Sequence, residues 1–199
     1  MRRRQLVAGI GSAAVVGGAG LFAAGATPSV FDSNDGGTGG TTGSDGDTDK
    51  GGDETEVIEP MTIETIDAPG SRDDEVTVPA TEQPTFVDFF GTWCPPCAEQ
   101  MPALGTASDR VGDDVRFISV TTEAVGRSVT ESEIADWWIE NDGDWLVGAD
   151  PTAELAAKLN VSAYPTAVVL DVSGRIQWSE SGVHTADELV TEIERVLDR

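Results

Sequence analysis

Cys94 and Cys97 are the only cysteines in the 199 residues, and two prolines separate them. Two thiols at this spacing can form and break a disulfide with each other, which is the chemistry of electron exchange with other thiols. A structural zinc site takes about four ligands, and the chain offers only His184 in addition. A purely structural disulfide across so short a loop would restrict the unfolded chain little. We therefore interpret the pair as a redox-active disulfide, with no metal bound.

The elements on either side of the pair must position it. Thr85–Phe90 (TFVDFF) is a short apolar run that predicts a buried strand, and residues 94–109 predict a helix that tolerates two prolines in its first turn. The N-terminus of a helix carries free N–H groups and a partial positive charge, and both stabilise a thiolate. We expect Cys94 to be exposed at this N-terminus and Cys97, one turn further, to be shielded.

The rest of residues 57–199 alternates strand and helix signals. The predicted strands are residues 57–66, 115–120, 145–147, Thr166–Leu170 and 175–179. The predicted helices are residues 130–140, which open on a Thr130–Glu133 capping box, residues 150–159 with Asp150 as N-cap, and a last helix that begins at Thr185 and has Leu189, Ile193, Val196 and Leu197 on its apolar face. This order describes an α/β fold with a central, partly parallel sheet.

The sequence TFVDFFGTWCPPC resembles the strand–WCxxC–helix signature of the thioredoxin-like thiol–disulfide oxidoreductases, in particular their exported TlpA/ResA-type branch. The resemblance covers about residues 57–199. It implies the thioredoxin fold, a central mixed sheet flanked by helices, with an inserted helical segment around residues 121–148. It also implies that Trp93 flanks the dithiol, and that Tyr164 and Pro165 form the loop whose cis-proline faces the dithiol and pairs with the substrate backbone. These three residues are the expected substrate-binding residues.

Asp88 interrupts the otherwise apolar strand, six positions before Cys94. Alternation along the strand indicates burial, and a buried carboxylate has a raised pKa. Thioredoxin has a buried aspartate at this spacing, which moves a proton to and from the second cysteine, so the resemblance implies a catalytic Asp88 beside Cys97. TlpA-type proteins often have asparagine here, and commonly have glutamate where this chain has Gln100. An exposed aspartate on an edge strand stays open as the alternative.

Two other functions on related folds are alternatives. A Sco-type copper-binding chaperone separates its cysteines by three residues and places a ligand histidine near the position of Tyr164, and this chain has neither feature. A peroxiredoxin has threonine three residues before its reactive cysteine, where this chain has Gly91. The chain shows no cofactor motif, so recycling of the pair calls for a redox partner, which we expect to be a membrane thiol carrier. By resemblance, the clients are proteins with cysteines or disulfides, such as apocytochromes or the copper-site cysteines of oxidases.

The N-terminal segment, residues 1–26, has the features of an export signal. Basic residues precede an uncharged run rich in Gly and Ala, the sequence RRQLV from Arg3 resembles the twin-arginine pattern, and the segment ends in AGA, a small-x-small cleavage pattern. Residues 6–26 are also long enough to remain as a membrane anchor. Either outcome places the domain outside the cytoplasm. Residues 27–56, rich in Gly, Ser, Thr and Asp, predict a disordered linker.

The chain is strongly acidic. It has 36 Asp and Glu against 12 Lys and Arg, a net charge of −24, and only two lysines. Such a surface repels phosphate backbones, which argues against nucleic-acid binding. Salt screens the repulsion between like charges, so the composition is typical of a halophilic protein that works at very high ionic strength.

Overall fold

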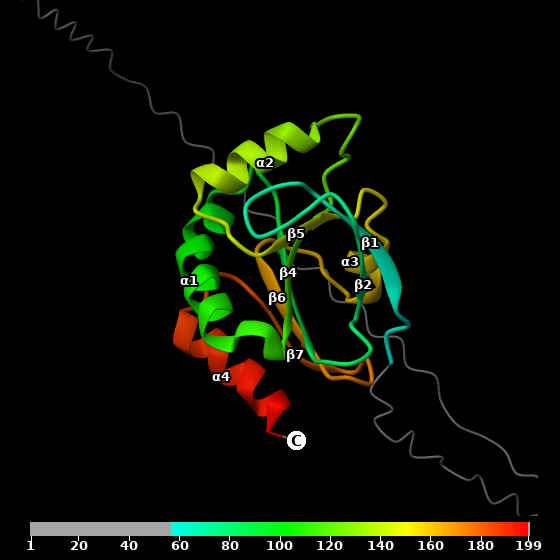
Figure 1. Ribbon diagram of the computed structural model, residues 1–199, viewed down its shortest axis with the longest axis vertical. Helices are drawn as coiled ribbons and strands as arrows, with labels where there is room; N and C mark the ends of the chain where they lie inside the picture. Colours follow the sequence, from blue (N-terminus) through cyan, green and yellow to red (C-terminus); the bar gives the residue numbers. More distant parts are fainter. Residues whose placement is uncertain (1–56, 199) are drawn as a thin grey trace, which may run out of the picture. The chain divides into compact units, whose positions relative to one another are not determined.

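The computed structural model describes residues 57–198, so the predicted signal or anchor (residues 1–26) and the whole of the predicted linker (residues 27–56) lie outside the described residues, as does residue 199. The strands are β1 (Met61–Thr65), β2 (Glu75–Val78), β3 (Thr85–Phe90), β4 (Arg116–Thr121), β5 (Leu146–Ala149), β6 (Thr166–Leu170) and β7 (Ile176–Ser181). The helices are α1 (Pro95–Val111), α2 (Glu131–Glu140), α3 (Glu154–Lys158) and α4 (Ala186–Leu197), with a 3-10 turn η1 at Gly112–Asp114 (Figure 1). None of the described helices is both long and apolar enough to span a bilayer.

The strands form one mixed sheet in the order β2-β1-β5-β4-β3-β6-β7. β3, β4 and β5 run parallel to one another, and every other neighbouring pair is antiparallel. β3 lies between β4 and β6, so both of its edges are hydrogen-bonded and all six of its residues are buried. This arrangement confirms the predicted α/β fold with a central mixed sheet. The position of β3 matters because the cysteine pair follows directly after it.

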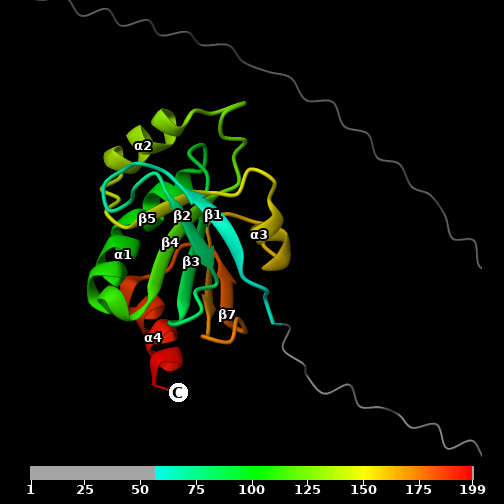
Figure 2. The same ribbon diagram turned by 45° about the vertical axis from the view of Figure 1, so that its right-hand side comes forward.

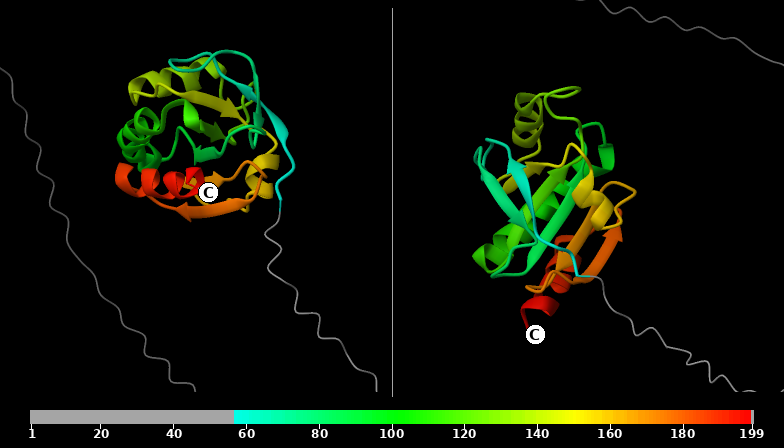
Figure 3. Two further views of the ribbon diagram at one scale, coloured as in Figure 1. Left: turned by 60° about the horizontal axis from the view of Figure 1, so that its bottom comes forward. Right: turned by 90° about the vertical axis from the view of Figure 1, so that its right-hand side faces the viewer.

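The helices cover both faces of the sheet. Figures 2 and 3 show α1 and α4 side by side on one face and α3 on the opposite face. Alternation along β3 sends Phe86 and Phe90 into the cluster under α1, α2 and α4, and sends Val87 and Phe89 into the second cluster with Leu155 of α3. Each buried aliphatic or aromatic side chain of this kind contributes about 1.5–3 kcal/mol to stability. The strand that precedes the cysteines is therefore held from both sides.

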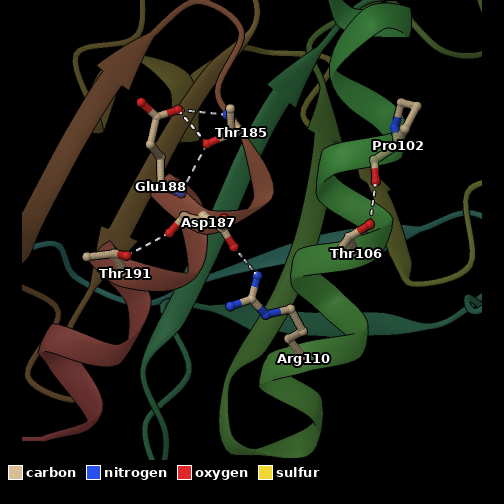
Figure 4. Close-up of polar contacts among 7 residues, drawn as sticks. All are labelled: Pro102, Thr106, Arg110, Thr185, Asp187, Glu188 and Thr191. Carbon is tan, nitrogen blue, oxygen red and sulfur yellow. Dashed lines mark hydrogen bonds and ion pairs between the residues drawn. The ribbon is translucent and has the colours of Figure 1, made fainter.

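The α1–α4 pair is also joined at its surface. Figure 4 shows Arg110 of α1 paired with Asp187 of α4, at 2.6 Å, and the capping box in which Thr185 and Glu188 exchange hydrogen bonds. The predicted start of α4 is confirmed, since its N-cap is Thr185. Its buried face differs from the prediction in two residues. Val190 is buried with Leu189, Ile193 and Val196, whereas Leu197 is 38% exposed because it is the last residue of the helix.

The start of α3 was predicted wrongly. Asp150 is not its N-cap, because Ala153 has a left-handed backbone (φ 54°) and the helix begins only at Glu154. The Asp150 carboxylate nevertheless reaches across this turn and accepts hydrogen bonds from the N–H groups of Glu154 (2.9 Å) and Ala156 (3.0 Å). Asp150 therefore satisfies free N–H groups of the first turn, as an N-cap residue does, from a position before it.

The insertion between β4 and β5 has the predicted helix. α2 opens on the Thr130–Glu133 capping box. Trp138 is fully buried, and the ring of Trp137 stacks on Phe90 with the ring centroids 5.0 Å apart. Phe90 ends β3, just before the cysteine loop, so this stacking places the insertion next to that loop. The short strand β2 was not predicted.

Candidate active site

Cys94 and Cys97 form a disulfide, with Cα atoms 5.3 Å apart, at the N-terminus of α1. Cys94 is the N-cap residue, and the prolines that follow occupy positions where a helix needs no donated N–H. The backbone N–H of Cys97 donates a hydrogen bond to Sγ of Cys94 at 3.3 Å. Once the disulfide is reduced, this donor and the positive end of the helix both favour negative charge on the Cys94 sulfur.

The two cysteines differ less in exposure than the sequence predicted. Cys94 is 4% exposed and Cys97 is 1% exposed. The expectation of an exposed Cys94 is wrong for this disulfide form, because its sulfur is bonded to Cys97 and lies against the first turn of α1. The exposed group beside the disulfide is Trp93, at 65%. Its indole lies close over Gly91, where an added Cβ would come within 2.9 Å of the ring.

The Tyr164–Pro165 loop lies beside this tryptophan. The Tyr164–Pro165 peptide is cis, which confirms the cis-proline that the resemblance implied. Pro165 directly precedes β6, and Thr166 at the start of β6 pairs with Phe89 near the end of β3. The rings of Trp93 and Tyr164 meet edge to face, with centroids 5.9 Å apart. The structure thus brings together the three expected substrate-binding residues.

Two residues that the sequence did not point to tie these loops together. Both follow β4 directly. The carboxylate of Glu123 accepts hydrogen bonds from the N–H (2.7 Å) and the hydroxyl (2.9 Å) of Thr92, two residues before Cys94. The hydroxyl of Thr122 is 2.5 Å from that of Tyr164. One loop therefore holds both the cysteine loop and the cis-proline loop. The only sequence signal was a polar Thr-Thr-Glu run at the end of a predicted strand.

Asp88 is buried, at 1% exposure, in an inner strand. The alternative of an exposed aspartate on an edge strand is therefore wrong. Side chains alternate along a strand, so Asp88 points to the same face as Phe86 and Phe90. Those two phenylalanines pack in the cluster that contains Cys94 and Cys97. Asp88 thus faces the helix layer that carries the disulfide.

The two oxygens of the Asp88 carboxyl have different surroundings. Oδ2 accepts a hydrogen bond, at 3.2 Å, from the hydroxyl of Ser119, which is opposite Asp88 on β4. Oδ1 is buried and has no hydrogen-bond partner among the described residues. Burial away from water raises the pKa of Asp88 from 3.8 to about 7, and the hydrogen bond from Ser119 opposes this rise. The carboxyl can therefore take up or release a proton near neutral pH.

Residues 67–197 match the family model described as Redoxin. The chain belongs to the redoxin family. Sporulation thiol-disulfide oxidoreductase A of Bacillus subtilis is 26% identical over 117 residues, which are 58% of this chain and 70% of the relative. Thiol-disulfide oxidoreductase ResA of Bacillus cereus is 22% identical over 111 residues, 56% of this chain and 62% of the relative. The crystal structure of StoA from Bacillus subtilis superposes with a TM-score of 0.58, at 23% identity, and covers 67% of this chain and 96% of that one.

These matches confirm the class predicted from the sequence. This redoxin is a thioredoxin-like thiol–disulfide oxidoreductase, and the relatives that it resembles include proteins named ResA. The match also places the cysteine pair, the cis-proline loop and Asp88 inside the family region, since all of them lie between residues 67 and 197.

One departure from TlpA-type chains has a structural explanation in this redoxin. Gln100 is 2% exposed, and its amide binds one backbone position twice: Nε2 donates to the carbonyl of His184 (3.1 Å) and Oε1 accepts from its N–H (2.6 Å). An amide satisfies this donor and acceptor together, whereas an ionised carboxylate only accepts. Gln100 therefore joins α1 to the segment before α4. The ring of His184, partly buried, packs edge to face on Trp178.

Proposed function

We propose that this redoxin is an exported thiol–disulfide oxidoreductase that exchanges electrons with protein disulfides through Cys94 and Cys97. One observation carries the proposal. The Cys94 sulfur caps a helix N-terminus and accepts the N–H of Cys97, which favours its thiolate, and the cis-proline loop lies beside the neighbouring Trp93. Neither alternative gains a supporting contact, because the positions where they need Thr and His are Gly91 and Tyr164, and both pack against Trp93.

In the reductive direction the Cys94 thiolate attacks a client disulfide. A bond forms between Cys94 and one client sulfur, and the other client sulfur leaves as a thiolate. Cys97 then loses its proton to Asp88 and attacks the Cys94 sulfur, which releases the second client thiolate and leaves Cys94–Cys97 oxidised. Two electrons pass from the pair to the client. The oxidative direction runs the same steps in reverse, with Asp88 returning the proton.

Client binding is assigned to Trp93, Tyr164 and Pro165. The indole of Trp93 is the large exposed apolar group next to the disulfide. Pro165 directly precedes β6, so its loop lies at the end of this strand, and we assign to it the pairing with a client backbone. The clients are proteins with cysteines or disulfides, and the role is in cytochrome or oxidase maturation. A membrane thiol carrier recycles the pair.

The direction of electron flow follows from the reduction potential of the Cys94–Cys97 pair. We expect a reductant, with a potential well below that of the glutathione pool, since that is what keeping client thiols ready for a metal or haem requires. Equilibration with glutathione mixtures, followed by trapping of free thiols, measures it. A potential as high as that of a strong periplasmic oxidant would reverse the assigned direction and leave the exchange chemistry intact.

Export is proposed from residues 1–26, as a twin-arginine signal peptide or retained anchor, with residues 27–56 as linker and residues 57–199 as the thioredoxin-like domain. Changing Arg3 and Arg4 to lysine should block export while expression stays normal, because twin-arginine signals require the guanidinium pair. Immunoblots of cytoplasmic and extracytoplasmic fractions measure it. A variant in which a neighbouring residue, Gln5, becomes alanine is the control. Normal accumulation of the double lysine variant outside the cytoplasm would discard this assignment.

The acidic composition supports the proposal that this protein functions in concentrated salt. The net charge of −24 makes the folded chain repel itself at low ionic strength. We expect the thermal midpoint to rise steadily as KCl is raised from about 0.1 M to about 1 M, where the Debye length falls from ~10 to ~3 Å. An equal ionic strength of another chloride salt is the control. A midpoint that does not depend on salt would refute the halophilic interpretation.

A further inference from the structure

A line of polar groups lies behind the Asp88 carboxyl. The indole N–H of Trp145, just before β5, donates to Oγ of Ser119 at 3.0 Å. Oγ of Ser119 in turn donates to Oδ2 of Asp88 at 3.2 Å. All three residues are buried, at 5%, 0% and 1% exposure respectively. Polar groups buried in a hydrophobic core are stable only when partnered, and such chains of hydrogen bonds reinforce one another.

The direction of these hydrogen bonds is fixed by chemistry. An indole nitrogen only donates, so Trp145 occupies a lone pair of the Ser119 hydroxyl and leaves its single proton for Asp88. A hydroxyl that donates to a carboxylate stabilises the charged form of that carboxylate. It also engages Oδ2, so that Oδ1, which has no partner among the described residues, is the oxygen left to carry a proton.

We propose that Ser119, held in place by Trp145, is a positioning residue that directs the exchanged proton to Oδ1 of Asp88 and favours the ionised carboxylate that resolution requires as a base. The proposal rests on the proposed function, in which Asp88 is the acid–base group for Cys97. In that step the Cys97 thiol gives its proton to Oδ1, its sulfur bonds to Cys94, and the client thiolate leaves. The proton then passes from Oδ1 to solvent, so protons and electrons balance.

Among the groups around Asp88, Ser119 is the one placed to control the ionisation of its carboxyl. The neighbouring strands place Ser119 (β4) and Ala167 (β6) directly beside it. The buried titratable groups of α1 and its N-cap are Cys97 and Cys94, and α2 and α4 bury only apolar side chains. His184, before α4, is partly buried and is held through its backbone by Gln100. Asp150, the other buried carboxylate of residues 57–198, is bound to N–H groups at the start of α3.

The pH dependence of resolution tests the proposal in the reduced full chain. The probe is dithiobis-nitrobenzoate, a disulfide whose halves are coloured when released. Attack by Cys94 releases one half and resolution by Cys97 releases the other, so stopped-flow absorbance separates the two steps. Ser119→Ala should raise the pH midpoint of the resolution rate by about one unit and leave the attack step unchanged. Trp145→Phe keeps a ring but removes the N–H donor, and should shift the midpoint less, in the same direction.

Thr85→Val is the matched control. Thr85 lies on the same strand as Asp88, is fully buried, and uses its hydroxyl to accept the N–H of Ala80 at 2.8 Å. Loss of the Thr85 hydroxyl should lower stability, as we also expect for loss of the Ser119 hydroxyl. It should not move the pH midpoint of the resolution rate. Equal shifts in Thr85→Val and Ser119→Ala would mean that lost stability is the cause and would overturn the proposal.

Asp88→Asn separates this proposal from the proposed function. If Asp88→Asn leaves the pH dependence of resolution as it is in the unmodified chain, the acid–base role of Asp88 fails, and the role of Ser119 fails with it. If Asp88→Asn removes the pH dependence but Ser119→Ala keeps the original midpoint, only the positioning role fails. We expect Ser119→Ala to have no further effect on the pH profile when combined with Asp88→Asn, since the group it acts through is then absent.

Discussion

Cys94→Ser should lose all but about 1% or less of thiol–disulfide exchange, because the nucleophile of the first step is gone. Cys97→Ser should keep the attack step but stop at the mixed disulfide, because no thiol remains to release the client. The basis is the hydrogen bond from the Cys97 N–H to the Cys94 sulfur, which favours the thiolate at residue 94 only. Non-reducing gels and mass spectrometry of client adducts measure trapping, and reduction of a protein disulfide measures turnover.

The alkylation rates of the two cysteines in the unmodified protein test the same assignment of roles. With the pair reduced, Cys94 should be alkylated at neutral pH much faster than Cys97. The double variant, with both cysteines changed to serine, is the control for adducts formed elsewhere. Trapping by Cys94→Ser instead of Cys97→Ser would exchange the two roles, and equal alkylation rates would remove the argument from the helix N-terminus.

Elements with local signals could be predicted from the sequence. β3 and β6 have the predicted bounds because each is a continuous apolar run, and α2 and α4 begin where the capping boxes of Thr130 and Thr185 place them. These signals depend on residues no more than a few positions apart. The start of α3 depends instead on a left-handed Ala153, for which alanine gives no signal. β2 was not predicted, because it has only four residues, of which one is buried.

In the candidate site, too, the features with local sequence signals could be predicted and those that depend on distant residues could not. The cysteine pair, the cis-proline loop and the burial of Asp88 followed from motifs and from alternation within single segments. The contacts of Glu123 with Thr92 and of Ser119 with Asp88 each join residues 31 positions apart. The second depends on the register of β3 with β4, which pairs these two residues and which the apolar pattern of each strand alone does not determine. Two buried polar residues in neighbouring parallel strands were the available hint.

Asp88→Asn should slow resolution on the order of 10–100-fold, because the amide keeps the shape of the carboxyl but can neither accept nor return a proton. Water that reaches the dithiol in part replaces the lost base, which is why the expected effect is at the low end for acid–base catalysis. Attack by Cys94 should change less. Stopped-flow measurements with the two-step disulfide probe give both rates across pH. The resolution rate of the variant should lose its dependence on pH near 7, the value to which burial raises the pKa of Asp88.

Asp88→Asn should also stabilise the folded protein, and the gain in stability should increase with pH. The pKa of Asp88 is raised from 3.8 to about 7 because its charged form is buried. Between these values the folded state binds more protons than the unfolded state, so stability falls as pH rises through this window and the full cost is present above it. A shift of about three units corresponds to about 4 kcal/mol. Asp88→Asn should therefore gain up to that amount above pH 7 and almost nothing near pH 4.

Urea denaturation of the oxidised protein at both ends of this pH range measures the effect without titration of the cysteines. Asp150→Asn is the matched control, because this buried carboxylate accepts two N–H groups and an amide offers a single oxygen. It should lose stability at neutral pH and keep the resolution rate. If Asp88→Asn shows unchanged rates, an unchanged pH profile and unchanged stability, the Asp88 carboxyl is solvated in solution and takes no part in proton transfer. A gain in stability without a slower resolution step would mean that Asp88 is a buried, destabilising acid that takes no part in proton transfer.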